Sequence, residues 1–181
     1  GFQISMTPKY VATAGAAWLE DGGCYVEANI RGGGEFGPTW HQAAKKELRN
    51  KAYEDFEAVA EDLVTEGVTT APMLACRGGS NGGLLVGNML VRRPELFGAV
   101  VCAVPLLDMR RFNKLLAGAS WMAEYGNPDT ADWDDFMWRY SAYHHVDGAA
   151  KYPPLLMTTS TRDDRVHPYH ARAFVRRLQE A

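Results

Sequence analysis

The sequence lacks the features that mark several large classes of protein. Its three cysteines are widely spaced and form no CxxC pair, which argues against a zinc module, and their odd number argues against a disulfide framework. The longest apolar run, around residues 99–107, is far too short to span a bilayer. A net charge of −3 gives no reason to expect a nucleic-acid partner, because nucleic acids favour basic faces. With 46% hydrophobic and 23% charged residues, the 181-residue chain is typical of about one globular domain.

The cysteines and the chain ends carry two further expectations. Cys24, Cys76 and Cys102 each lie in an apolar segment, so we expect buried free thiols, a reducing compartment and a cytoplasmic location. The chain starts with Gly1 rather than methionine, and a helical pattern over residues 171–181 stops without glycine or proline. We therefore expect a fragment of a longer protein.

Short apolar runs alternate with helical patterns along the chain. This alternation predicts βαβ units and a mostly parallel sheet, in which ligands bind at the carboxyl ends of the strands. Residues 108–150, rich in Trp, Tyr and Asp, are expected to form helices and loops over the sheet edge. We expect strands at residues 24–30, 73–76, 99–104 and 155–160, and helices at residues 53–66, at residues 84–91 and from Pro168 onward.

A glycine-rich stretch, CRGGSNGGLL at residues 76–85, falls between a predicted strand and a predicted helix. Residues 78–82 match G-x-S-x-G, which in this context indicates a nucleophile elbow with Ser80 on a strained turn. The helix N-terminus then offers free N–H groups to a developing oxyanion, and the backbone N–H of Asn81 is one candidate donor. The competing interpretation is a glycine-rich turn in which Ser80 caps the helix.

An acid is expected in the loop after a later strand, since the chain order in an α/β-hydrolase is Ser, Asp, His. Asp163 follows the predicted strand at residues 155–160 and suits this position, although a solvated charge cluster is an open alternative. A metal site built from Asp163, His167 and His170 has no clear fourth ligand. We expect no metal and no cofactor.

Residues 32–37 formally fit G-x-G-x-x-G, and Asp55 lies at a suitable distance for a ribose contact. A pyrophosphate needs a helix N-terminus immediately after the glycines, whereas the helical pattern begins only later. We therefore expect a loop that borders the site rather than a dinucleotide site.

No histidine is well placed to act as the base. His167 and His170 follow Asp163 too closely, on a helix expected to point them away from Ser80. The other three histidines precede the acid, and we expect His144 and His145 to form hydrogen bonds within a loop. The sequence thus predicts a nucleophile and an acid without their base.

Five stretches together resemble the prolyl oligopeptidase family of serine peptidases, over nearly the whole chain. The resemblance implies an α/β-hydrolase fold, with a mostly parallel sheet, flanking helices and both ends incomplete. Residues 1–181 would then be part of the peptidase catalytic domain. The stretches are ANIRGGGEFG (28–37), GGSNGGLL (78–85), RRPELFGAVV (92–101), SWMAEYG (120–126) and DDRVHPYH (163–170).

The resemblance also implies roles for individual residues. Ser80 resembles the nucleophile, and Asp163, not Asp164, resembles the triad acid. Arg165 resembles the arginine that binds a carbonyl of the peptide, and Trp121 resembles the indole that stacks on the substrate's proline. The rest of the implied pocket is Phe2, Leu106, Tyr125 and Val166. Some members carry valine at the position of Leu106, and core packing is the alternative role for Phe2 and Tyr125.

The activity implied is hydrolysis of short peptides after proline through an acyl-enzyme on Ser80. Three parts of the family are missing: the second oxyanion donor (a tyrosine), the triad histidine expected beyond Ala181, and the β-propeller expected in the full-length protein. We therefore expect these 181 residues alone to be inactive, with no nucleic-acid or membrane partner. The alternatives are a peptidase for basic residues like oligopeptidase B, a carboxylesterase, and a non-catalytic hydrolase-like module.

Overall fold

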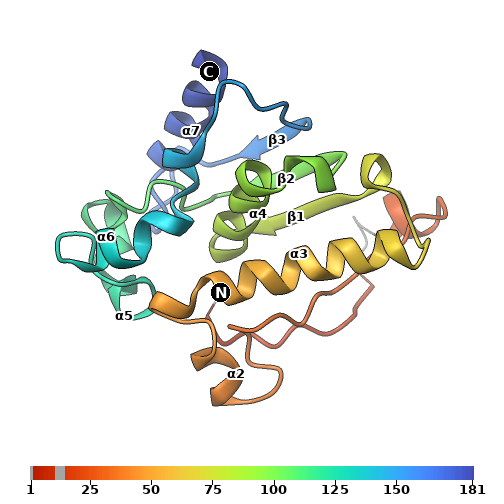
Figure 1. Ribbon diagram of the computed structural model, residues 1–181, viewed down its shortest axis with the longest axis horizontal. Coiled ribbons are helices and arrows are strands. Elements are labelled where there is room, and N and C mark those ends of the chain that lie inside the picture. Colours follow the sequence, from red (N-terminus) through yellow and green to blue (C-terminus); the bar gives the residue numbers. More distant parts are fainter. Residues whose placement is uncertain (1, 11–14) are drawn as a thin grey trace.

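Three parallel strands lie at the centre of the structure, with helices packed around them (Figure 1). The computed structural model describes residues 2–10 and 15–181. The strands are β1 (Ala75–Gly79), β2 (Ala99–Ala103) and β3 (Leu155–Thr158), in the order β1-β2-β3. Both pairs are parallel, which confirms the predicted parallel sheet with flanking helices.

The register of the strands brings their carboxyl ends to one edge. Gly79 pairs with Ala103, and Ala103 pairs with Thr158. Two hydrogen bonds continue the ladder past the strands: Ser80 N–H donates to Ala103 O (2.9 Å), and Val104 N–H donates to Thr158 O (2.8 Å). The loops that follow the three strands therefore start side by side, where a site is expected in such a sheet.

The helices predicted around the sheet are present. Pro168 directly precedes the last helix, as expected. No helix in residues 2–10 and 15–181 has the length and apolar character needed to cross a membrane. The α-helices are α2 (Pro38–Gln42), α3 (Asn50–Thr65), α4 (Asn81–Arg92), α5 (Met122–Tyr125), α6 (Asp132–Asp135) and α7 (Tyr169–Glu180). Shorter helical turns are Gly15–Leu19, Lys46–Leu48, Ala71–Met73, Pro94–Leu96, Phe112–Lys114, Leu116–Trp121, Met137–Tyr140 and Ala142–His145.

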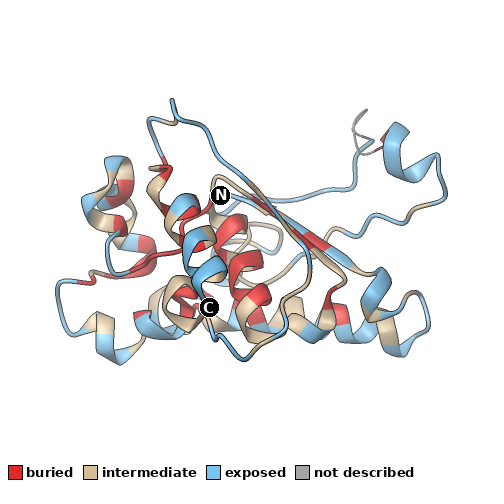
Figure 2. Cartoon of the chain, turned by 90° about the horizontal axis from the view of Figure 1, so that it is seen from above, coloured by how far each residue is buried: buried red, intermediate tan, exposed pale blue. Residues whose placement is uncertain are grey.

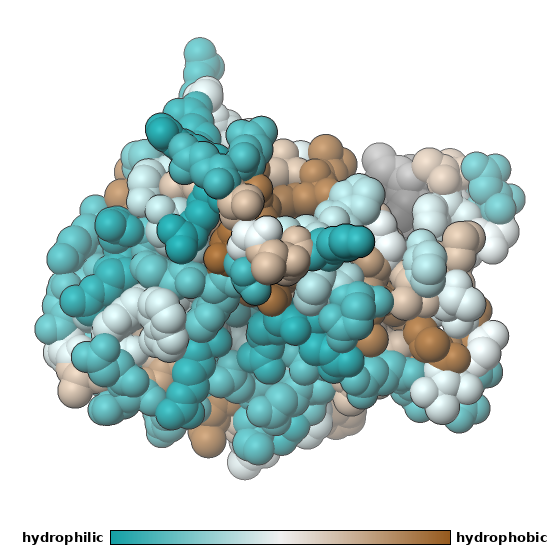
Figure 3. All heavy atoms as spheres, turned by 45° about the horizontal axis from the view of Figure 1, so that its top comes forward, coloured by the Kyte–Doolittle hydropathy of each residue, from teal (hydrophilic) through white to brown (hydrophobic). Residues whose placement is uncertain are grey.

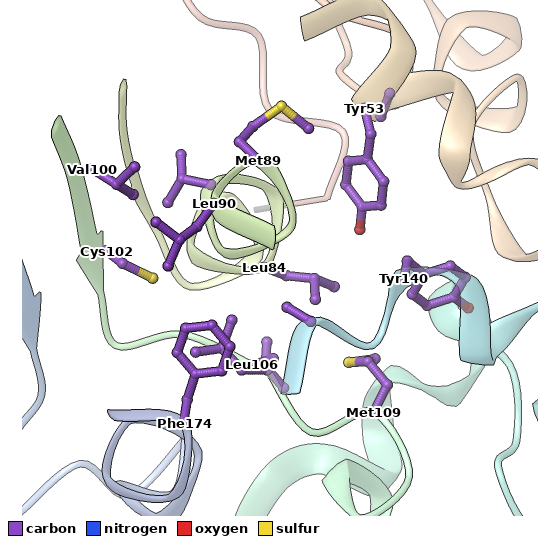
Figure 4. Close-up of a cluster of buried hydrophobic side chains, with 14 of the residues drawn as sticks. Tyr53, Leu84, Met89, Leu90, Val100, Cys102, Leu106, Met109, Tyr140 and Phe174 are labelled. Carbon is purple, nitrogen blue, oxygen red and sulfur yellow. The ribbon is translucent and has the colours of Figure 1, made fainter. Parts of the chain in front are cut away.

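The core is built around α4, which packs on β1 and β2 and carries α3 on another side. Leu84 and Leu90 of α4 are fully buried, as is Cys102 of β2. Phe174 of α7 reaches the same cluster and lies close to Leu106 (Figure 4). Burying each large side chain contributes about 1.5–3 kcal/mol, so α4 and its neighbours hold the sheet edge in place.

The predicted strand at residues 24–30 is absent from the structure. A strand needs a ladder of backbone hydrogen bonds to a neighbouring strand. Here Asn29 reaches the segment around Met6 through a side-chain hydrogen bond instead, from Nδ2 to Met6 O (3.0 Å). Tyr25 and Val26 remain 45% and 46% exposed. Figure 2 shows that this early part of the chain is mostly exposed. The apolar pattern of residues 24–30 is therefore not enough to form a strand, because no neighbouring strand pairs with it.

One strand boundary differs from the prediction, and one strand lies at an exposed edge. The strand expected at residues 73–76 is β1, shifted to Ala75–Gly79 because Ala71–Met73 is a helical turn. Residues 108–150 form short helices and loops, as expected. β3 lies at an edge of the sheet, and its Leu156 is 59% exposed. Figure 3 shows hydrophobic side chains reaching the surface among hydrophilic ones.

Candidate active site

Ser80 stands on the tight turn between β1 and α4. Its backbone angles are φ 57° and ψ −115°, a conformation that residues with a side chain rarely adopt. The side chain makes no capping hydrogen bond to α4, so the interpretation of Ser80 as a helix cap is wrong. A strained serine between strand and helix has the geometry of a nucleophile elbow.

The glycines around Ser80 differ in how much they are needed. A Cβ on Gly78 would lie 2.1 Å from the carbonyl oxygen of Gly82, and a Cβ on Gly83 would lie 2.8 Å from Cα of Pro105. A Cβ on Gly79 would make only ordinary contacts, and one on Gly82 would meet nothing within 4 Å. Steric clearance therefore explains Gly78 and Gly83, but not all four glycines.

The loop after β3 reaches Ser80 through an arginine. Arg165 Nη1 donates a hydrogen bond to Ser80 Oγ at 2.8 Å, which leaves the serine proton free for a base. The carboxylate of Asp163 shapes this loop, because its Oδ1 accepts the N–H groups of Arg165 (3.0 Å) and Val166 (2.8 Å). Asp164 is exposed. The nucleophile, the predicted acid and the predicted peptide-binding arginine thus belong to one connected group.

Asn81, the first residue of α4, is held through its side chain. Its Oδ1 accepts hydrogen bonds from Arg49 Nη2 (2.6 Å) and from the hydroxyl of Tyr125 (2.8 Å). Burial raises the pKa of Tyr125, so its hydroxyl stays protonated and can donate. The backbone N–H of Asn81 belongs to the first turn of a helix, where it has no partner within the helix. The residue expected to hold an oxyanion is therefore firmly placed.

The residues expected to form the proline pocket divide into two groups. Phe2 and Trp121 are half-buried and keep accessible surface. Tyr125, Leu106 and Val166 are at most 2% exposed and pack in the core. Phe2 lies edge-on against Tyr125, with ring centroids 5.4 Å apart. The buried group thus belongs to the core cluster, against which Phe2 and Trp121 are packed.

The three histidines that precede Asp163 all have partners away from Ser80. His41 is buried, with Nε2 2.7 Å from Glu124 Oε2. His144 and His145 form hydrogen bonds within their loop, as predicted. Burial lowers the pKa of His144.

The two histidines that follow Asp163 are also engaged. His167 Nδ1 accepts the N–H of Tyr169 (3.0 Å), and His170 Nδ1 accepts the N–H groups of Leu107 (3.3 Å) and Asp108 (3.2 Å). Burial lowers the pKa of His170 to about 4. Each of the chain's five histidines is thus bonded to a group other than Ser80 or Asp163.

The other motifs supply no competing site. α2 begins at Pro38, directly after Gly37, so the expectation that the helix begins only later is wrong. The helix has five residues, and the carboxylate of Asp55 is occupied by the backbone N–H and guanidinium of Arg31. Within residues 2–10 and 15–181, no cluster of three or more His, Cys, Asp or Glu side chains could hold a metal ion.

Sequence reasoning missed the residues behind the elbow. Arg49 and Glu124 lie 75 positions apart in the chain, and neither belongs to a catalytic motif. Glu124 is a lone charge in the stretch SWMAEYG, whereas Arg49 stands in the charged stretch KKELRNK (45–51), where no signal sets it apart. The structure joins them, and through Arg49 it joins both to Asn81.

Comparison with known proteins identifies relatives of the whole chain. Residues 10–181 match the prolyl oligopeptidase family. The chain is 55% identical over 172 residues to an uncharacterized peptidase of Sinorhizobium fredii, covering 95% of this chain and 24% of that protein. It is 41% identical over 180 residues to a prolyl endopeptidase of Elizabethkingia miricola, covering 99% of this chain and 25% of that protein.

Solved structures agree with these relatives. A post-proline cleaving enzyme from Rickettsia typhi superimposes with a TM-score of 0.96 at 44% identity, over 99% of this chain and 26% of that enzyme. A structure from a study of two prolyl endopeptidases gives a TM-score of 0.94 at 46% identity, over 98% of this chain and 26% of its own. The chain thus spans about a quarter of the length of its relatives. With its α/β-hydrolase fold and its serine elbow, this chain belongs to the prolyl oligopeptidase family.

Proposed function

We propose that the chain is the nucleophile-bearing part of a serine peptidase that cleaves short peptides after proline. The observation that carries this proposal is the strained backbone of Ser80, with Arg165 donating to its Oγ at the carboxyl ends of the strands. Strain of this kind is maintained only where the surrounding structure imposes it, and it concentrates at functional sites. Membership of the family supports the same assignment.

The chemistry follows from the groups at the elbow. Ser80 Oγ attacks the scissile carbonyl carbon while a base takes its proton, and the carbonyl oxygen becomes an oxyanion held by the N–H of Asn81. Collapse of this intermediate breaks the C–N bond, and the protonated base returns its proton to the leaving amine. Water then hydrolyses the acyl-enzyme. Asp163 would orient the base and stabilise its protonated form.

The base in this proposal is a histidine supplied by protein beyond these 181 residues. The support is that all five histidines present form hydrogen bonds elsewhere. We further propose that residues 1–181 are part of a catalytic domain and that the full-length protein also carries a β-propeller. Relatives about four times as long leave room for both. These residues alone should therefore show no turnover.

The proposed preference for proline rests on the aromatic residues that the family resemblance assigns to the pocket. Trp121 is half-buried and offers an indole face, which suits a rigid apolar pyrrolidine ring. Phe2 packs edge-on against the buried Tyr125. Arg165 lies one hydrogen bond from Ser80, so its guanidinium can also bind a peptide carbonyl close to the scissile bond.

A reducing compartment suits the cysteines. Cys76 and Cys102 are free and buried, and burial raises the pKa of both thiols to about 12. Cys24 is free but exposed, so the expectation that it is buried is wrong. Thiols of this kind are structural rather than reactive. We propose a cytoplasmic location, which fractionation of cells that express the full-length protein would test.

The function is tested with the full-length protein and three substrates. Two are peptide p-nitroanilides, one ending in proline and one in arginine, and the third is a simple p-nitrophenyl ester. We expect the proline peptide to be cleaved with the highest kcat/KM and Ser80→Ala to abolish cleavage. Faster turnover of the arginine peptide would indicate a peptidase for basic residues. Preference for the simple ester would indicate a carboxylesterase, and no turnover of any substrate would indicate a non-catalytic module.

A further inference from the structure

A buried chain of polar side chains runs from the elbow into the protein. Arg49 donates from Nη2 to Asn81 Oδ1 (2.6 Å) and from Nη1 to Glu124 Oε1 (3.1 Å). The other oxygen of Glu124 lies 2.7 Å from His41 Nε2. Arg49 is 3% exposed, and Glu124 and His41 are each 5% exposed. The order of contacts is therefore His41, Glu124, Arg49, Asn81.

Arg49 also touches Tyr125, one of the residues expected to form the proline pocket. Its guanidinium carbon lies 4.6 Å from the centre of the Tyr125 ring, and the Tyr125 hydroxyl donates to the same oxygen of Asn81. Glu124 is the neighbour of Tyr125 in α5, and Arg49 directly precedes α3. One side chain at the start of α3 therefore contacts both α4 and α5 next to the elbow.

The geometry of the guanidinium explains why arginine stands here. A buried charge must be paired, and Glu124 alone would satisfy that requirement. The planar fork of arginine presents two nitrogens in fixed directions, so the second nitrogen can bind a separate acceptor. That acceptor is Asn81 Oδ1, which also accepts from Tyr125. Two donors fix this oxygen, and with it the first residue of α4.

We propose that Arg49 is a positioning residue that holds the oxyanion donor, the backbone N–H of Asn81, in register with Ser80. It does so through the Asn81 side chain, while Glu124 and His41 hold Arg49 in turn. This inference rests on the proposed function, because it assigns a task within the same reaction. An N–H that bonds the oxyanion acts on the transition state and not on the bound substrate, so loss of its position lowers kcat and leaves KM nearly unchanged.

The far end of α4 offers a matched control. Arg92 Nε lies 2.9 Å from Glu57 Oε1, and Arg92 Nη1 donates to Asn50 Oδ1 at 2.9 Å. Its guanidinium lies 5.7 Å from the centre of the Tyr53 ring. Arg92 therefore contacts a carboxylate, an asparagine oxygen and a tyrosine ring, as Arg49 does, but at the end of the helix opposite Ser80.

The experiment is a double-mutant cycle in the full-length protein, with Arg49→Lys, Asn81→Ala, both changes together, and Arg92→Lys. Lysine keeps the positive charge beside Glu124 but has a single nitrogen, so it cannot hold Glu124 and Asn81 as a fork. Asn81→Ala removes the held oxygen and keeps the backbone N–H. Kinetics with a proline p-nitroanilide peptide give kcat and KM, and thermal unfolding reports on the fold.

We expect Arg49→Lys to lower kcat by about 10- to 100-fold, below the full loss of an oxyanion donor, with KM changed by less than about twofold. The double variant should be no slower than Asn81→Ala, because Arg49 acts through that side chain. Arg92→Lys should keep kcat. The proposal would be overturned if the fold-loss of kcat in the double variant were the product of the two single losses. A wild-type kcat in Arg49→Lys would also overturn it.

A second measurement applies if Arg49→Lys folds poorly. Glu124→Gln keeps an oxygen acceptor for Arg49 but removes the charge, so we expect a smaller loss of kcat. Affinity for a peptide aldehyde ending in proline, which forms a tetrahedral adduct with Ser80, should fall in parallel with kcat. Unchanged aldehyde affinity with reduced kcat would contradict the proposal. Failure of the proposed function shows separately, as the wrong substrate preference in the wild-type protein, and the cycle can then be run on the substrate that is cleaved.

Discussion

The two ends of α4 use the same kinds of side chain under different conditions. At its start, Arg49 is 3% exposed and pairs with a buried glutamate beside the strained Ser80. At its end, Arg92 and Arg93 form ion pairs with the glutamates of α3 and with Glu95, and the arginine side chains are 27% and 31% exposed. Arginine pairing alone therefore does not mark a functional site in this fold.

Burial and strain separate the two ends. A buried charge that loses its partner costs about 3–5 kcal/mol, whereas an exposed ion pair contributes about 0–1 kcal/mol. The start of α4 therefore has one permitted arrangement, while the end tolerates change. A rigid support of this kind is what a group that must meet a transition state requires.

The largest expected effect on kcat comes from substituting Gly78, the glycine before the elbow turn. Gly78→Ala places a Cβ 2.1 Å from the carbonyl oxygen of Gly82, so the turn must move, and we expect kcat to fall by at least about 100-fold. Steady-state kinetics of the full-length protein measure this. Gly82→Ala is the matched control, because a Cβ at this position in α4 would meet nothing within 4 Å. Since alanine favours a helix more than glycine does, it should stabilise the protein by up to about 1 kcal/mol. Equal thermal stability in the two variants would contradict the clearance argument.

A second effect concerns His170, which supports the loop after β2. Its folded-state pKa of about 4 lies below the ordinary value of 6.5, so the unfolded chain binds a proton between these values and the folded chain does not. Stability should therefore be complete above pH 6.5 and fall as the pH drops toward 4, by about 2 kcal/mol at pH 5. Denaturant unfolding at pH 7.5 and pH 5 should show a smaller difference in His170→Gln than in the wild type or in the control His145→Gln. An unchanged difference in His170→Gln would refute this.

The smallest effect belongs to the exposed end of α4. Arg93→Ala removes contacts to Glu61 and Glu95, whose side chains are 51% and 61% exposed. We expect a loss of stability of at most about 1 kcal/mol, shrinking further in 1 M salt, with kcat unchanged. Thermal unfolding at two salt concentrations measures it. A loss of thermal stability in Arg93→Ala as large as that measured for Gly78→Ala would contradict the contrast between the two ends of α4.

The elbow could be predicted from sequence because its causes are local. A strand, a serine and a helix follow one another within residues 75–92, with one clearing glycine on each side of the serine, Gly78 and Gly83. The strand at Ala99–Ala103 followed from its valines and found partners on both sides. Residues 24–30 carry a similar apolar pattern but no ladder partner, and they form no strand. Pairing, which sequence patterns do not report, decided between them.

The support behind the elbow could not be predicted, because it depends on long-range contacts. His41 and Glu124 lie 83 positions apart, and Arg49 and Asn81 lie 32 apart. The chain brings them together only after α3, α4 and α5 have packed. The burial of Tyr125 and Leu106 has the same origin, since their exposure depends on neighbours from distant segments.

The central claim is that Ser80 is the nucleophile of a peptidase that recognises proline. It is tested most directly by treating the full-length protein with a diphenyl phosphonate of a peptide ending in proline, followed by peptide mapping. Attack by Ser80 Oγ on phosphorus displaces one phenoxide and leaves a stable adduct. We predict an adduct on Ser80, absent in Ser80→Ala and formed more slowly by the arginine phosphonate. An adduct at another residue, or one that persists in Ser80→Ala, would contradict the account.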